Sequence, residues 1–151
     1  MRLQTVDFSD PAYGDVHEVF VSGPGAPKLE RIEDLAGQEV YARPSSSYFE
    51  HLLELNRRFR EQGLEPIKVM PANENLETED LLQMVNAGLF GITVADRYIA
   101  QLWQPLYSDL KVHQGFYLHT GGKLGWALRK NSPQLRQALN DFNKEHKIGS
   151  E

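Results

Sequence analysis

Hydrophobic and polar positions change their period several times along this chain. Residues 16–21 (Val-His-Glu-Val-Phe-Val) are β-branched and aromatic, and the run stops at the glycines and prolines of 22–27, which predicts a strand followed by a loop. Shorter strand-like runs lie at 39–43, 67–70 and 90–95, and a further strand is expected at 124–129 after a turn at Gly121 and Gly122. Residues from Val112 onward form a less regular extended stretch.

Helical spacing alternates with these strands. A single turn is predicted at residues 32–37, and a longer helix after Ser45 that ends at Gly63. Thr78 is expected to cap a third helix, which Gly88 ends, and a fourth runs from Arg97 to Trp103. In the last helix Ser132 is the expected cap, Pro133 takes the first position, and the apolar stripe is Leu135, Leu139 and Phe142.

The alternation of strands and helices predicts the fold class. Strand, helix, strand, helix, strand, helix in this order favours an α/β domain with a mostly parallel sheet flanked by helices. At 151 residues the chain fits one domain with a sizeable core.

Composition and charge narrow the classes of function. The formal net charge is −5 with acids and bases interspersed, so nucleic acid is not an expected partner. No apolar run approaches the roughly 18 residues that a membrane-spanning helix needs. The first residues carry no apolar export segment, and we interpret the chain as a piece of a larger exported protein.

Motifs for catalysis, metals and cofactors are not found. There is no cysteine, and the five histidines include no i, i+4 pair or close cluster for zinc. Nucleophile elbows and phosphate loops are also missing. The carboxylates at 74–80 raise the question of a glycosidase pair, but they lie in a polar loop before a helix start, a solvated arrangement. We therefore predict no catalytic residue, no metal site and no cofactor.

Two places favour ligand binding over chemistry. Ser45, Ser46 and Ser47 place hydroxyls and free amides at a helix start after a buried strand, which suits a carboxylate, although plain capping explains them as well. Arg43, at the same strand end, could grip a carboxylate or be an ordinary exposed arginine. Asp96 ends a central strand and could hold an ammonium group, with helix capping as the alternative.

Four ordered segments carry a family resemblance: 6–13 (Val-Asp-Phe-Ser-Asp-Pro-Ala-Tyr), 32–40, 85–96 and 125–135. They resemble the hinge crossover, the Leu-x-Gly turn and strand, the strand ending in aspartate, and the return strand with final helix of family 3 bacterial extracellular solute-binding proteins. The whole chain thus resembles the second lobe of a type II periplasmic binding fold. Details at 22–27, 41–48 and 65–80 are similar to the solute-binding-like module of F-type lytic murein transglycosylases.

The resemblance implies roles for particular residues. Ser46 and Ser47 match positions that hold a ligand carboxylate, and Asp96 matches the aspartate that holds the amino group. Arg43 and Ser45 are added as ligand contacts, while Asp10 and Tyr13 match the hinge motif. The implied organisation is a single lobe, with the crossover and first strand at 1–22, the lobe body at 23–124 and the return strand with the last helix at 125–151. The first lobe and the catalytic domain of such a protein are expected outside the chain.

The function implied is non-catalytic sensing of a muropeptide or amino acid, in the periplasm or on the periplasmic side of the outer membrane. The expected partners are that ligand, the first lobe and the catalytic domain. The alternatives are a lobe of an amino-acid transport binding protein, a dehydratase on the same fold, and a spacer that no longer binds ligand.

Overall fold

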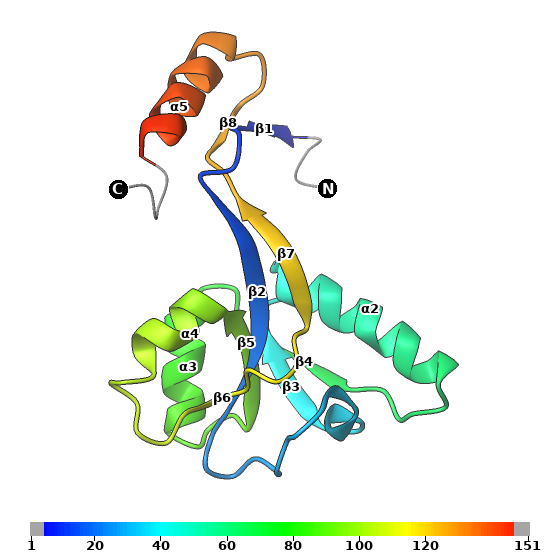
Figure 1. Ribbon diagram of the computed structural model, residues 1–151. Coiled ribbons are helices and arrows are strands. Elements are labelled where there is room, and N and C mark those ends of the chain that lie inside the picture. The colour runs from blue at the N-terminus through cyan, green and yellow to red at the C-terminus, as the bar shows by residue number, and fades with distance from the viewer. Residues whose placement is uncertain (1–4, 147–151) are drawn as a thin grey trace. The chain divides into compact units, whose positions relative to one another are not determined.

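A computed structural model describes residues 5–146 of the chain (Figure 1). The chain divides into two compact units. One, here called the body, is His17–Thr120, and the other, here called the terminal unit, combines Met1–Val16 with Gly121–Glu151.

The body is built on a mixed sheet with the strand order β4-β3-β5-β2-β6. The strands are β2 (Tyr13–Ser22), β3 (Glu39–Ala42), β4 (Lys68–Pro71), β5 (Ile92–Asp96) and β6 (Lys111–Val112), and β7 (His119–Leu124) also pairs with β2. β3 pairs in parallel with β4 and β5, whereas β2 pairs antiparallel with β5 and β6. The α/β class is confirmed, and the sheet is mixed where a mostly parallel one was expected.

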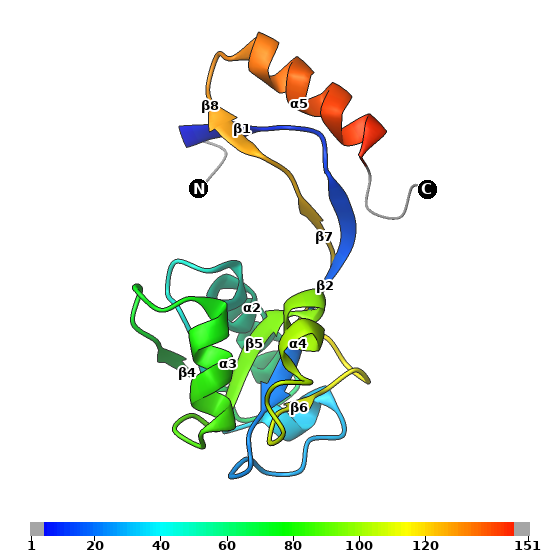
Figure 2. The same ribbon diagram turned by 90° about the vertical axis from the view of Figure 1, so that its left-hand side faces the viewer.

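Helices cover both faces of this sheet. Figure 1 shows α2 (Ser47–Glu61) on one face, and α3 (Thr78–Asn86) with α4 (Arg97–Trp103) on the other, the side that faces the viewer in Figure 2. A short 3-10 helix, η1 (Ile32–Leu35), precedes β3, as predicted. Gly37, with φ of 71°, then turns the chain.

Alternation along β2 supplies one hydrophobic core to each face. Phe20 packs with the α2 side chains Leu52 and Phe59, whereas Val19 and Val21 pack with residues of α3 and α4. Successive side chains of a strand point to opposite faces, so one strand can serve two cores. The adjacent apolar residues at 19–21 of the run that predicted this strand have their physical reason here.

Asn56 fastens α2 to the chain just before β4. Its side-chain amide donates to the carbonyl of Ile67 over 2.8 Å, and its carbonyl accepts from the Ile67 amide over 2.7 Å. Both groups are buried, and the paired bonds fix the start of the strand.

The terminal unit pairs β1 (Val6–Phe8) antiparallel with β8 (Ala127–Arg129) and adds α5 (Pro133–Glu145). Asn143 is the buried residue of α5, and its side chain donates to the carbonyl of Asp10 and accepts from the Trp126 indole. Leu135 and Phe142, expected in the buried stripe, are 47% and 50% exposed. Within this unit, the helix therefore packs through an amide and not through its apolar stripe.

Three local predictions are corrected. Gly121 and Gly122 lie inside β7 and do not form the expected turn. Glu77, not Thr78, is the N-cap of α3, and its amide donates to the Asp80 carboxylate over 2.7 Å. Ser132 occupies the N-cap of α5 without a side-chain capping bond.

Candidate functional site

The predicted ligand contacts gather at one edge of the body's sheet. β3, β4 and β5 are parallel, so their carboxyl ends lie at the same edge. Arg43 follows β3 directly, residues 72–77 follow β4, and Asp96 ends β5. Ligands of open α/β sheets bind at such an edge.

Ser46 behaves as a cap. Its hydroxyl accepts from the Phe49 amide over 3.2 Å and donates to the carbonyl of Arg43 over 2.7 Å. The capping alternative thus accounts for its hydroxyl, while a ligand role for Ser46 stays a prediction.

Two acids of the segment 72–77, Glu74 and Glu77, bind Ser45 and Arg43, which were predicted to contact the ligand. The amide of Ser45 donates to Glu74 over 2.9 Å, and its hydroxyl donates to the other oxygen of the same carboxylate. The Arg43 guanidinium lies 3.2 Å from a carboxylate oxygen of Glu77. Both predicted anion-holding groups therefore already hold carboxylates of this chain.

Glu18 is a central residue that the sequence reasoning missed. It is only 5% exposed, accepts from the Ser47 hydroxyl over 3.1 Å, and lies 2.7 Å from Nδ1 of His51. The His51 ring stacks on His119 at 4.1 Å between centroids. A buried carboxylate thus links the strand β2 to the start of α2.

Asp96 lies opposite Glu18 in the antiparallel register of β2 and β5. Paired positions of this kind point to the same face of a sheet. Burial raises the pKa of the Asp96 carboxyl above its ordinary value; a hydrogen bond from Tyr48 opposes the increase, and the charge of Glu18 adds to it. Asp96 occupies the N-cap of α4, but its side chain makes no capping bond.

No cationic side chain within residues 5–146 forms an ion pair with Asp96. Its polar neighbours are instead two tyrosines: hydrogen bonds from Tyr48 and Tyr98 favour the ionised carboxyl, and the Tyr48 hydroxyl also accepts from the Asp96 amide over 3.1 Å. Burial is also the largest cause of a raised pKa at Tyr48. The carboxylates of Glu18 and Asp96 therefore lie on the same face of the sheet. Within the described residues, only Glu18 of these two acids pairs with a basic side chain, that of His51.

One signal in the sequence could have found Glu18. The β-branched and aromatic run at 16–21 predicts a strand, and a glutamate that such a strand buries needs a partner. Since the partners Ser47 and His51 lie about thirty positions away, only the folded chain shows them.

A hollow of about 420 Å³ adjoins this site through His51. Its lining comes from α2 and from the segment 117–120, namely His51, Glu54, Arg58, Tyr117, Leu118, His119 and Thr120. The hollow is therefore mixed in charge, with aromatic rings at its wall.

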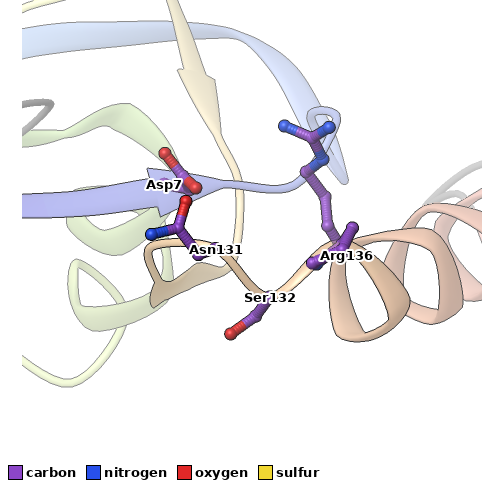
Figure 3. A pocket seen from close by; sticks show the side chains of 5 residues that line it. Asp7, Asn131, Ser132 and Arg136 are labelled. Atoms are coloured by element: carbon purple, nitrogen blue, oxygen red, sulfur yellow. The ribbon is translucent and has the colours of Figure 1, made fainter.

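The terminal unit has a hollow of about 400 Å³ of its own, lined by Asp7, Asn131, Ser132, Pro133 and Arg136. In Figure 3 the Ser132 side chain points away from the other labelled side chains, so these groups do not converge on one point. The predicted hinge residues lie elsewhere in the unit: the Asp10 amide donates to Asn140 over 2.7 Å, and Tyr13 begins β2.

The part of the chain that the structure describes contains no group of three or more His, Asp or Glu side chains arranged to hold a metal ion. None of its helices combines the length and the apolar character needed to cross a bilayer.

Two curated relatives share this sequence pattern. The chain is 31% identical over 146 residues to a membrane-bound lytic murein transglycosylase F from Desulfosudis oleivorans, covering 97% of the chain and 30% of the relative. It is also 31% identical over 137 residues to the protein of the same name from Saccharophagus degradans, covering 91% and 25% respectively. The chain thus spans less than a third of the length of these relatives. No family model matches it.

Solved structures show the fold. An ancestral arginine-binding protein bound to glutamine superposes with a TM-score of 0.74 at 22% identity, over 95% of this chain and 59% of that one. The chain has the fold of a periplasmic-binding-protein lobe. The substrate-binding protein of an amino-acid ABC transporter gives the same TM-score at 20% identity, over 95% and 58% of the two chains.

The resemblance inferred from the sequence is confirmed: the chain has the fold of amino-acid-binding proteins, and its sequence is similar to part of transglycosylase F. Its type II periplasmic binding fold is likewise confirmed. The roles of Arg43, Ser45, Ser46, Ser47 and Asp96 in binding, and of Asp10 and Tyr13 in a hinge, stay predictions.

Proposed function

We propose that the lobe is a non-catalytic sensing domain that binds an amino acid or a short peptide through its ammonium group. The observation that carries this proposal is the half-buried Asp96 carboxylate, which faces the same side of the sheet as Glu18 and has no cationic partner within residues 5–146. A ligand ammonium would supply the positive charge that Asp96 lacks.

The other end of the ligand is a carboxylate held at the start of α2. The amides and hydroxyls of Ser45 to Ser47, together with Arg43, suit a negative group, and the helix dipole favours one there. Ser45 and Arg43 bind carboxylates of the chain itself, so their geometry is suitable for this chemistry.

We propose a muropeptide as the preferred ligand. The hollow beside His51 gives room next to the site for more than a free amino acid, and the relatives are named for action on murein. In this proposal the whole protein acts in peptidoglycan turnover at the periplasmic side of the envelope. A first lobe and a catalytic domain elsewhere in it are the partners.

In that whole protein, ligand would close two lobes about a hinge that includes Asp10 and Tyr13. Closure would report the ligand to the catalytic domain only if the ligand binds the closed and open states with different affinity. The lobe itself makes and breaks no bond.

A second candidate function is amino-acid delivery to a transporter. The observation that favours it is the fold shared with an amino-acid ABC transporter's binding protein and with an arginine-binding protein holding glutamine. A transport lobe would respond to one free amino acid rather than to murein peptides.

The test is a proton–nitrogen NMR titration with free amino acids and murein peptides, following the amides of Ser45 to Ser47 and Asp96. Asp96→Asn should weaken binding about tenfold or more, because a charged hydrogen bond is lost. The matched control is Asp109→Asn, which neutralises an exposed aspartate. Equal affinity of the two variants, or no shift in the native chain at millimolar ligand, would contradict the proposal.

Asp96→Asn has a second readout that separates binding from structure. Because the folded pKa lies above the ordinary 3.8, stability declines as pH rises from 3.8 through the folded pKa, and ionised Asp96 lowers stability above it. The variant should therefore be more stable than the native chain at pH 7. If Asp96 acted only as a helix cap, the stability at pH 7 would instead stay nearly unchanged, because asparagine caps a helix about as well as aspartate.

A further inference from the structure

The segment 72–77, between β4 and α3, presents its acids to the groups that would hold a ligand carboxylate. The Glu74 carboxylate accepts hydrogen bonds from both the amide and the hydroxyl of Ser45, one with each oxygen. Glu77 takes the Arg43 guanidinium over 3.2 Å. One short segment thus covers two of the predicted contacts.

Hydrogen bonds from backbone amides hold this segment in place at both ends. The Ala72 amide donates to the carbonyl of Ala42 over 3.0 Å, and the Glu77 amide donates to Asp80 over 2.7 Å. Between them, Asn73 forms a turn, since its side-chain oxygen accepts from the Asn75 amide over 2.9 Å. Glu74 is therefore delivered to Ser45 by a fixed loop.

The acids at this edge differ in how readily they can leave. Glu18, on Ser47, is buried at 5% exposure, so moving it would uncover a charged group inside the core. Glu77 is 72% exposed in its side chain, and Glu74 is exposed too, so water can solvate both when they swing away. Glu74 and Glu77 are thus the exchangeable carboxylates.

We infer that Glu74 is a built-in competitor for the carboxylate of the ligand, with Glu77 supporting it on Arg43. The inference rests on the proposed function, because it concerns the same site. A tethered carboxylate is present at an effective concentration in the millimolar range or above. A ligand that offers only a carboxylate is therefore excluded, and one that also offers an ammonium to Asp96 can displace Glu74.

Glu74→Gln tests the competition directly. The amide keeps the size of the side chain but removes its charge, and a neutral acceptor holds Ser45 less strongly than a carboxylate does. The probe is acetate, and its binding is followed at the Ser45 amide. We expect this variant to bind acetate about five- to tenfold more tightly than the native chain does. Glu50→Gln, an exposed acid in the first turn of α2, is the matched control and should leave the affinity unchanged.

Two readouts are needed from the proton–nitrogen spectra of the full chain. Before any probe is added, the Ser45 amide resonance should shift in Glu74→Gln and not in Glu50→Gln. An unmoved Ser45 resonance, equal acetate affinity in the two variants, or no acetate binding to Glu74→Gln would each overturn the inference.

Titration with murein peptides separates this inference from the proposed function. If acetate binds Glu74→Gln more tightly but no peptide or amino acid shifts the amide resonance of Asp96, the competition stands and the proposed function fails. If peptides move Asp96 with the same affinity in the native chain and in Glu74→Gln, the proposed function stands and the competition fails.

Discussion

The body and the terminal unit bury different kinds of side chains. In the body, two groups of buried apolar residues lie on the two faces of the sheet, around Phe20 on one and Val19 on the other. In the terminal unit, Leu128 is buried together with Ser9 and Asn143, while Trp126 and Phe142 are 53% and 50% exposed. Apolar contact dominates in the body, whereas hydrogen bonds carry a larger share in the terminal unit.

The difference shows what an apolar stripe can and cannot specify. A stripe on a helix tells which face tends to leave water, but burial requires an opposing surface. α2 meets such a surface on the sheet, whereas the described part of the terminal unit leaves Leu135 and Phe142 exposed. Hydrogen bonds depend on direction instead, and Asn143 satisfies its amide on Trp126 and Asp10.

The largest expected effect on the free energy of unfolding comes from replacing one phenylalanine in each region by alanine. Phe20→Ala should lower the free energy of unfolding by about 3–5 kcal/mol, because Phe20 is fully buried and the cavity cannot fill. Phe142→Ala, the matched control in the terminal unit, should change it by less than about 0.5 kcal/mol. Urea unfolding followed by circular dichroism measures both, and similar losses for the two variants would break the comparison.

A smaller effect is expected from Asn143→Ala. It leaves the Trp126 indole and the Asp10 carbonyl without their partner, which should cost about 1–3 kcal/mol. The loss should be local: hydrogen exchange should quicken in residues 6–10 and 126–129 and stay unchanged in β3 and β5. Gln134→Ala, which removes an exposed amide side chain in the first turn of the same helix, is the control for the loss of an amide group. Uniform quickening across the whole chain would contradict a locally held unit.

The smallest effect concerns pH and the body. His113 is 5% exposed and lies 2.8 Å from the Ser22 hydroxyl. Burial lowers its pKa below the ordinary 6.5, with the charge of Lys111 as a second cause. The stability that comes from the neutral ring is complete above pH 6.5 and is lost as pH falls through the lowered pKa.

Unfolding measured at pH 7.5 and pH 5 should therefore show a decline that His113→Gln reduces. His146→Gln, an exposed histidine in the terminal unit, should leave the decline as it is. If His113→Gln has the same pH dependence as the native chain, the burial of His113 does not set it.

Local chemistry allowed much of the fold to be predicted from the sequence. α4 has the bounds Arg97–Trp103 that were expected, and α2 begins at Ser47, the last residue of the serine run, and ends before Gly63. Strand direction was harder to predict, because antiparallel pairing of β2 with β5 depends on a contact between residues some seventy positions apart. The turn expected at Gly121 was wrong for a similar reason, because β7 pairs with β2, which is far away in the sequence. The strand continues through Gly121, which has a φ of 73°.

The candidate site was predicted in position but not in its internal bonds. Arg43, the serine run and Asp96 do meet at one edge, as strand ends of parallel strands must. The acids at 74–80 were interpreted as a solvated cluster, yet Glu74 bonds Ser45, twenty-nine positions earlier. Glu18 was not considered because its partners are equally remote in sequence.

The bonds between Asn56 and Ile67 also bear on how copies of this chain avoid one another. β4 lies at one end of the strand order, and an open strand edge is a template for edge-to-edge aggregation. Just before its first residue, both backbone groups of Ile67 are taken by the Asn56 side chain, and its last residue, Pro71, has no amide hydrogen to offer. With the exposed charge of Lys68 between them, a foreign strand finds donors blocked at both ends of this edge.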